Sequence, residues 1–410
     1  MARTLAELPK GSRITDHISL GVIAKTFPEE RVKAVLAEAG RASKRCRQMP
    51  GHVVVYYVIW MALHMQVSCG EVLRSLLEGI RWLVGQAGKV KVTGKSGISQ
   101  ARGRVGWEPM KQLYEEVVRP IARRGAERTT KGAWYRQWHL VSVDGSGLDV
   151  ADTRENAEAF GRPGASRGES AYPQIRFVTL VENGTHVLYR AEMDSYETGE
   201  ATLAPSVVAH LKPGDLCLAD RNFFSYALWC KARSTGADLL WRMKINARLP
   251  RLKELPDGSY LSKVYPSDKD RRHDTKGVWV RVIEYTLENV PDAEPLYRLA
   301  TTILDPEQAP AEELAALYHE RWEIENSLDE LKTHLRGRHM VLRSKTPDLV
   351  RQEFYGLMLA HFAVRGLMHE AALQADEDPD RLSFTHTVNV VRRKLPLFVA
   401  IPPYGKASFS

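Results

Sequence analysis

Cysteine is scarce in this chain, with four among 410 residues and no two of them in a CxxC pair. This argues against a disulfide framework and against a structural zinc site, and it fits a reducing compartment. Long apolar runs are also missing, because the longest, from Val53 to Leu63, is about half of the roughly 20 residues that a bilayer crossing needs. No apolar stretch follows Met1 as in a signal peptide. We therefore expect a cytoplasmic protein with no membrane partner.

Several common catalytic patterns are absent as well. The thirteen histidines form no HExxH motif and no triad-like cluster, and no P-loop is present. The chain also has no internal repeat and no low-complexity tract. These absences argue against zinc peptidases, P-loop hydrolases and repeat scaffolds, and they leave the acidic residues as the best catalytic candidates.

The charge balance favours a polyanionic partner. The net charge is +8 and the pI is near 9.2, while 44% hydrophobic content allows a full core and two or three domains. Residues 81–137 hold 13 Lys or Arg against 4 Asp or Glu, a local excess of nine that more than accounts for the total. This segment is a candidate nucleic-acid surface. An ordinary basic enzyme with a solvated surface remains the alternative.

The hydrophobic pattern divides the chain into five regions. Residues 1–135 are predicted to be helical and basic, with a helix-turn-helix or plain solvated segments as alternatives. Residues 136–244 predict three strands, a helix, a strand, a helix and a strand, which indicates a mixed sheet flanked by helices in an α/β fold. Residues 245–304 predict a β-rich insertion, 305–375 a return to helix, and 376–410 a helical tail.

The segment YHERWEIENSLDELK, residues 318–332, places four functional groups at helical intervals. On one continuous helix, Tyr318, Arg321, Glu325 and Lys332 fall within roughly 60° of arc. A buried stripe is predicted beside them, formed by Leu317, Ile324, Leu328, Leu331 and Leu335. The arrangement fits a helix that borders a cleft. A simple surface ion pair between Arg321 and Glu325 is the alternative.

Two aspartates end apolar strands elsewhere in the chain. Asp144 lies in VSVDGSG, where glycines allow close approach of a substrate, and Asp220 ends DLCLAD. Each could be only a cap or a turn former. Together on adjacent strands, and facing Glu325, they would need a cation, and Mg²⁺ or Mn²⁺ suits carboxylate oxygens. Two such ions could clamp a phosphodiester for in-line displacement.

These motifs resemble the DDE transposases of the insertion sequence 4 family. The resemblance rests on VDGSG, LADRNFFS and the pattern Tyr-x2-Arg-x3-Glu-x6-Lys, and it extends to VLRSKTPDLVRQEFYGLMLAHFAVR and ITDHISLGVIAKTFPEERV. It implies an RNase H-like catalytic core made of residues 136–244 and 305–375, interrupted by the insertion, with residues 1–135 as a DNA-binding domain. It further implies that Asp144, Asp220 and Glu325 hold two Mg²⁺ ions, replaceable by Mn²⁺.

The resemblance also implies the reaction and the partners. Such enzymes hydrolyse DNA at transposon ends, form and open hairpin ends, and transfer the strands into target DNA. Tyr318, Arg321 and Lys332 are then expected to contact DNA near the cut. The partners would be double-stranded DNA, as terminal inverted repeats and target, and a second copy of the chain in a homodimeric synaptic complex at the nucleoid of a bacterial cell.

Three further residues are candidates for DNA contact. A base extruded during hairpin formation commonly stacks on an aromatic ring, so Trp279 and Trp322 are considered, with packing in a sheet core or at the cleft edge as the alternatives. Arg221, next to Asp220, could reach a phosphate or form a structural ion pair. Two other functions stay open: an inactive, transposase-derived DNA-binding protein, and a metal-dependent nuclease of the same fold that does not transfer strands.

Overall fold

The computed structural model describes residues 18–393, with gaps at 44–48, 84–91, 126–127, 166–167, 170–171, 288–293, 320 and 339. In its central part the predicted strands and helices occur in the predicted order, but a helix and two short strands between the first two strands were not predicted. The predicted elements are β2 (Trp138–Asp149), β5 (Gln174–Glu182), β6 (Val187–Ser195), α8 (Glu200–Val208), β7 (Asp215–Ala219), α9 (Tyr226–Arg233) and β8 (Asp238–Arg242).

These strands form the mixed sheet that the sequence predicted. Their spatial order is β6-β5-β2-β7-β8. The first three pair antiparallel, whereas β7 pairs parallel with β2 and β8 pairs parallel with β7. Three antiparallel strands followed by two parallel ones make the RNase H-like arrangement, so the expected fold class is confirmed. The parallel pairs matter most here because their carboxyl ends meet at one edge.

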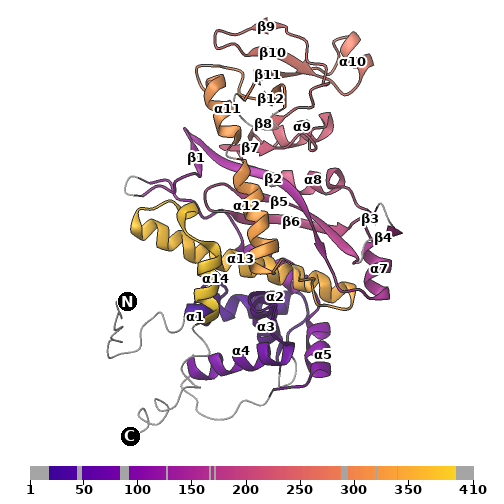
Figure 1. The fold of residues 1–410 in the computed structure, drawn as a ribbon, viewed down its shortest axis with the longest axis vertical. Coiled ribbons are helices and arrows are strands. Elements are labelled where there is room, and N and C mark those ends of the chain that lie inside the picture. Colours follow the sequence, from indigo (N-terminus) through magenta and orange to yellow (C-terminus); the bar gives the residue numbers. More distant parts are fainter. Residues whose placement is uncertain are drawn as a thin grey trace, which may run out of the picture.

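The insertion continues the same sheet. Its strand β12 pairs antiparallel with β8, and β11 and β10 follow outward, so that the sheet runs without a break into the turn-rich region (Figure 1). The β-rich character predicted for residues 245–304 is therefore confirmed. Its elements are β9 (Lys253–Glu254), β10 (Tyr260–Val264), α10 (Asp268–Arg272), β11 (Val278–Tyr285) and β12 (Tyr297–Thr301).

The two faces of the sheet carry different helices. Leu140, Leu218 and Leu240 belong to a hydrophobic cluster under α11 (Ala311–His319). Arg321, just before α12 (Trp322–Asp329), pairs with Asp144 on the same side, whereas Ile324 and Leu328 of α12 belong to the larger cluster. The strand residues next to these leucines, such as Val141 and Ala219, belong to the larger cluster and point to the other face. This division holds for β7, β8, β11 and β12 and for β2 as far as Asp144, whereas in β5 the larger cluster includes neighbouring residues on both faces, such as Leu180 and Val181. We call the side of α11 the helix-α11 face.

The N-terminal helices share a core with the sheet. Helix α13 (Pro347–Ala375) lies between them and the sheet, and one continuous hydrophobic cluster runs from Val58 of α3 through Phe354 of α13 to Phe177 of β5 (Figure 1). The predicted domain boundary at residue 135 therefore does not separate two hydrophobic cores, and the DNA-binding role of residues 1–135 stays a prediction. The N-terminal helices are α1 (Ile18–Thr26), α2 (Glu29–Glu38), α3 (Gly51–Leu63), α4 (Cys69–Leu83), α5 (Lys95–Val105) and α6 (Glu108–Val117).

Short elements complete the described chain. None of the described helices combines the length and the apolar character that a membrane span requires. Part of the basic segment, residues 84–91, lies outside the described residues, as does the end of the predicted tail. The remaining elements are β1 (Trp134–Tyr135), α7 (Arg154–Phe160), β3 (Gly164–Ala165), β4 (Gly168–Glu169), the π-helix η2 (Glu330–Leu335), the 3₁₀-helix η3 (Pro379–Arg381) and α14 (Phe384–Arg393).

Candidate active site

Asp144 and Asp220 lie side by side at the carboxyl edge of the parallel strands. Val143 of β2 pairs with Ala219 of β7, and the two aspartates are the next residues on each strand. Strand alternation places both on the helix-α11 face, because Leu140 and Leu218 point there and the aspartates follow at even spacing. Asp220 directly follows the end of β7, as predicted, whereas Asp144 lies within β2, which continues to Asp149 beside β5 after its pairing with β7 has stopped.

The segment 318–332 is not one continuous helix, so the prediction that its four functional groups share one face of a single helix was wrong. Helix α11 ends at His319, and α12 begins at Trp322. Arg321 lies in a tight turn between them, where its N–H donates to the Tyr318 carbonyl at 3.2 Å. A π-helical turn, a feature often found at functional sites, then carries Lys332. The predicted leucine stripe is nevertheless buried throughout.

The Arg321 guanidinium lies among the three carboxylates. Its nitrogens are 3.0 Å from Glu325 Oε1 and 3.8 Å from Asp144 Oδ2. Burial opposes the Arg321 charge, but Tyr318 and the charges of Asp144, Asp220 and Glu325 outweigh it, and the pKa of Arg321 is raised. The predicted ion pair with Glu325 therefore forms. It also joins all three carboxylates in one electrostatic group, and Glu325, 44% exposed, faces solvent.

Asp144 is the most strongly perturbed of these acids. Burial raises its pKa to about 6, and the charges of Glu200 and Asp220 act in the same direction, against a Gly145 hydrogen bond and Arg321. Glu200, at the start of α8, was not singled out from the sequence, since nothing in its neighbourhood marks it. A Cβ atom at position 145 would come within 2.5 Å of the Glu200 carboxyl carbon. The glycine thus leaves room for a fourth acidic side chain.

Lys332 is tied to the strand that carries Asp144. Its Nζ donates to Ser146 Oγ at 2.9 Å. Burial and the neighbouring Arg336 lower the pKa of Lys332, so an anion that enters the site would stabilise its charged form. The Lys332 ammonium therefore lies next to Ser146, which is two residues after Asp144 on β2, at the edge of the carboxylate group.

Tyr318 has a different environment from the one expected of a DNA contact. Its side chain is only 6% exposed, and its hydroxyl donates to the Ala219 carbonyl at 3.2 Å. This bond fixes the strand end just before Asp220. Burial raises the pKa of Tyr318, so the hydroxyl remains protonated. The predicted contact with DNA stays a prediction.

The three additional DNA-contact candidates differ in their surroundings. Trp279 is 44% exposed and is stacked by Lys263, whose Nζ lies 4.9 Å from the ring centroid. It therefore does not pack in a sheet core. Arg221 forms an ion pair with Glu294 at 2.9 Å. This is the structural ion pair that was considered as the alternative to a phosphate contact. The side chain of Trp322 lies outside the described part of the chain.

Trp279 is on the same face of the sheet as the carboxylates. In β11 the residues at odd positions, Trp279, Arg281 and Ile283, share a face, and Ile283 belongs to the cluster under α11. Trp279 is thus an exposed ring on the helix-α11 face, on the part of the sheet that the insertion adds. That Trp279 and the carboxylates share a face is inferred only from the alternation of side chains along the strands.

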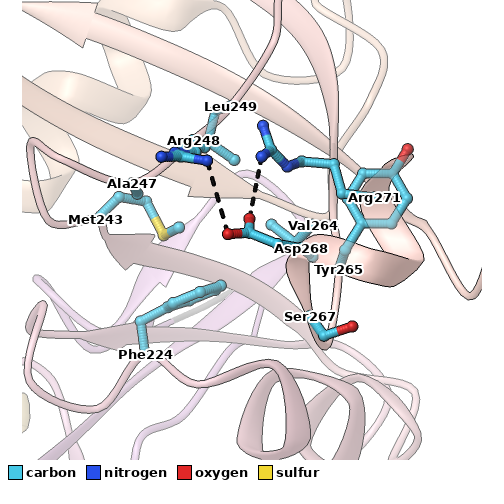
Figure 2. A pocket seen from close by; sticks show the side chains of 10 residues that line it. All are labelled: Phe224, Met243, Ala247, Arg248, Leu249, Val264, Tyr265, Ser267, Asp268 and Arg271. Atoms are coloured by element: carbon cyan, nitrogen blue, oxygen red, sulfur yellow. Dashed lines mark hydrogen bonds and ion pairs between the residues drawn. The ribbon is translucent and has the colours of Figure 1, made fainter. Parts of the chain in front are cut away.

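A cavity of about 270 Å³ lies on the opposite face and is separate from this site. Val264 and Met243, which line it, belong to the larger hydrophobic cluster. Figure 2 shows Asp268 among the lining residues, paired with two arginines, Arg271 at 3.0 Å and Arg248 at 3.6 Å. The charges that line the cavity therefore pair with one another.

The donor set at the carboxyl edge fits a hard divalent cation. Asp144, Asp220 and Glu325 present carboxylate oxygens, and Glu200 adds negative charge that Arg321 alone does not balance. The three sets of oxygens do not all lie within 4.8 Å of one another among the described groups, so the geometry is open rather than closed. Such a site can accept ligand atoms from a substrate in addition to those of the protein.

Comparison with known proteins agrees with this geometry. A family model described as the transposase DDE domain matches residues 139–363, and a second, the insertion element 4 transposase N-terminal region, matches residues 17–115. The chain belongs to the DDE transposases of the insertion sequence 4 family. It is thus an enzyme of DNA cleavage and strand transfer, and members of this class use divalent metal ions.

Two proteins that match in sequence give the same class. The chain is 28% identical over 375 residues to transposase InsG for insertion sequence element IS4 of Escherichia coli K12, covering 89% of this chain and 80% of InsG. It is 30% identical to the putative transposase InsZ of the same strain, covering 54% and 71%. A solved piggyBac transposase synaptic complex with hairpin DNA is 13% identical with a TM-score of 0.47, over 94% of this chain and 82% of that one.

Proposed function

We propose that the chain cuts double-stranded DNA at terminal inverted repeats and joins the ends to target DNA, with Asp144, Asp220 and Glu325 as the catalytic residues. One observation carries the proposal. Two aspartates follow the last paired residues of adjacent parallel strands, and Glu325 faces them across Arg321. The carboxylates would hold two Mg²⁺ ions, or Mn²⁺ in their place, which supply positive charge to the phosphate that is cut.

The basic residues of the site have separate roles in this proposal. Lys332, held at Ser146, contacts a phosphate oxygen of the strand next to the cut. Arg321 already bridges two carboxylates and contacts the same phosphate when DNA enters. Tyr318 fixes the end of β7, so that its contribution is to position Asp220. Arg221 contacts the DNA backbone only if it leaves Glu294.

Hairpin formation at the cut end is the finer part of the proposal. The freed 3′ hydroxyl attacks the opposite strand, which requires a bent duplex and an extruded base. Trp279 supports this step because it is exposed and lies on the helix-α11 face. Its ring can stack on a base, and Lys263 beside it adds positive charge near the backbone.

Two copies of the chain would hold the two ends in one synaptic complex. In this proposal the DNA extends from the basic N-terminal region to the active site. Helix α13 connects these two parts of the protein through a shared hydrophobic core. The C-terminal helix α14 is a candidate element of the dimer interface. DNA binding by many phosphates predicts a steep loss of affinity with salt, close to one power of concentration for each neutralised phosphate.

The experiment is cleavage of a plasmid that carries the inverted repeats flanking this coding sequence. Wild type is compared with Glu325→Gln and with Glu312→Gln, a control on the exposed side of α11. We expect metal-dependent cuts at the repeat ends, with hairpin-capped fragments on a denaturing gel, in wild type and control only. If the wild type binds the ends but cuts in neither Mg²⁺ nor Mn²⁺, the catalytic proposal is wrong. Cuts without joined products would instead favour a nuclease.

A further inference from the structure

A second acidic cluster lies on the other side of α12, at the turn between β5 and β6. It consists of His186 from that turn, Glu323 from α12, Glu330 from η2, Arg365 from α13 and Asp380 from η3. We call it the turn cluster. Its members come from five places in the chain, so the cluster exists only in the folded protein.

Three of these side chains converge on one point. Single ligand atoms of His186, Glu323 and Asp380 all lie within 4.8 Å of one another, and the described residues contain no other such group of three. His186 Nε2 is 3.0 Å from Asp380 Oδ1. Ligand atoms of one Zn²⁺ ion, each about 2 Å from the metal, are separated by about 3 Å. The His186–Asp380 spacing is that of neighbouring metal ligands, and an oxygen of Glu323 lies within 4.8 Å of both.

His186 is the observation that points to a ligand. It is only 4% exposed, and its Nε2 makes no hydrogen bond of acceptable geometry with any described residue, although Asp380 is close. A buried ring nitrogen without a partner is costly. The residue also adopts a left-handed backbone conformation, with φ of 57°, which a side chain other than glycine rarely takes. The turn thus holds the imidazole inward at a conformational cost.

The other ring nitrogen is held as metal-binding histidines usually are. His186 Nδ1 is 3.2 Å from Glu330 Oε1, and Arg365 also contacts this side of the ring. Arg365 in turn binds Glu330 through two hydrogen bonds of 2.6 and 2.8 Å. A carboxylate on one nitrogen fixes the tautomer and leaves the opposite nitrogen ready for a metal.

The charges of the cluster also call for a cation. Three carboxylates, Glu323, Glu330 and Asp380, face one guanidinium and one imidazole. Negative charge is therefore in excess at a place that water reaches poorly. A divalent ion would offset this excess.

We propose that His186, Glu323 and Asp380 form a structural binding site for one divalent transition-metal ion of the Zn²⁺ type. The imidazole favours Zn²⁺ over Mg²⁺, and the two carboxylates complete three protein ligands. The ion joins the β5–β6 turn, the first turn of α12 and the segment after α13. Because α12 also carries Glu325, the ion fixes the helix that presents the third catalytic carboxylate. The site is independent of the proposed reaction.

The test measures Zn²⁺ bound to the purified full-length chain after dialysis against excess Mg²⁺, together with the thermal unfolding midpoint. We expect one Zn²⁺ per chain and, with free Zn²⁺ about a hundredfold above the dissociation constant, a midpoint higher by about 3 °C. Both effects should be lost in His186→Gln and in Asp380→Asn. They should remain in His273→Gln, which alters an exposed histidine of the insertion, and in Asp144→Asn.

Each outcome decides the proposal. Zinc that is absent from the wild type, or that stays bound in Asp380→Asn, would overturn it. Loss of zinc in Asp144→Asn, with retention in His186→Gln, would assign the ion to the catalytic carboxylates and also overturn it. Asp380 is at a more exposed position than His186, so Asp380→Asn decides the question if His186→Gln does not fold.

Discussion

Helix α12 separates two acidic clusters that differ in exposure and in what balances their charge. Glu325 faces Asp144 and Asp220, with which it is proposed to act in catalysis, and is 44% exposed, whereas Glu323, two residues earlier, accepts a hydrogen bond from the Gly184 N–H at 2.7 Å. Residues two apart on a helix point about 200° away from each other. One helix can thus serve a cleft on one side and a packed turn on the other.

The comparison teaches that exposure decides what an acidic cluster can do. The proposed catalytic carboxylates are balanced by Arg321 in an open geometry, which leaves the site accessible to DNA and metal in the proposed function. The turn cluster is closed by Arg365, which is bound to Glu330 and almost fully buried. Charge that a substrate can reach is available for catalysis, and charge that it cannot reach acts on stability.

The largest effect is expected from Asp144→Asn. Removal of a metal-holding carboxylate should slow cleavage at least about a thousandfold, equivalent to about 4 kcal/mol. The same change should stabilise the fold at pH 7 by up to about 3 kcal/mol, because the folded state holds a carboxylate whose pKa is raised from 3.8 to about 6. Single-turnover cleavage and urea unfolding measure the two effects. A less stable variant would contradict the assignment.

Glu330→Gln tests the closed side of the comparison. Arg365 would lose its charged partner while buried, so the free energy of unfolding should fall by about 3 kcal/mol. Cleavage by the folded fraction should continue. The neighbouring Asp329→Asn, at an exposed position, is the matched control and should change stability by less than about 1 kcal/mol. Equal effects in the two variants would mean that burial does not distinguish them.

Trp279→Ala extends the comparison to the open face of the insertion. Loss of one base-stacking contact, about 1–3 kcal/mol, should reduce hairpin formation by about tenfold to a hundredfold. Stability should hardly change because the ring is 44% exposed. Leu252→Ala, which also shortens an exposed apolar side chain of the insertion, serves as control. An unchanged hairpin yield with normal first-strand cutting would exclude a stacking role.

The smallest expected effect is on the pH dependence of cutting. Asp144 has a raised pKa of about 6, so its ionised form declines as pH falls through that value. The cleavage rate should drop by about tenfold between pH 7 and pH 5. For stability the sign is opposite: between about pH 4 and 6 the folded state binds more protons than the unfolded state, so this residue makes stability fall as pH rises. A flat rate profile would remove Asp144 from the rate-limiting step.

Much of the fold and of the carboxylate group could be predicted from sequence. Alternation and turn residues located the central strands, and Asp144 and Asp220 were recognisable because each follows an apolar run, although β2 continues beyond Asp144. The break at Arg321 was not predictable, because the segment has helical spacing throughout, and its turn lies where Tyr318 and Arg321 make long-range contacts with Ala219 and Asp144.

The turn cluster was missed for a related reason. His186 lies 194 residues before Asp380 in the chain, and no local spacing connects them. Trp279 was placed correctly in a strand, but its exposure depends on which layers cover the insertion. Glu200 is near Asp144 only because α8 packs back on the sheet. Local patterns therefore predicted elements and strand ends, whereas contacts between distant segments required the structure.

The most direct test of the central claim compares Glu325→Gln with Glu323→Gln in the same two assays, plasmid-end cleavage and the zinc-dependent rise of the unfolding midpoint. The account predicts that Glu325→Gln loses cleavage by at least about a thousandfold and keeps the zinc effect. It predicts that Glu323→Gln loses the zinc effect and cuts within about tenfold of wild type. Cleavage by Glu325→Gln at the wild-type rate would contradict the account.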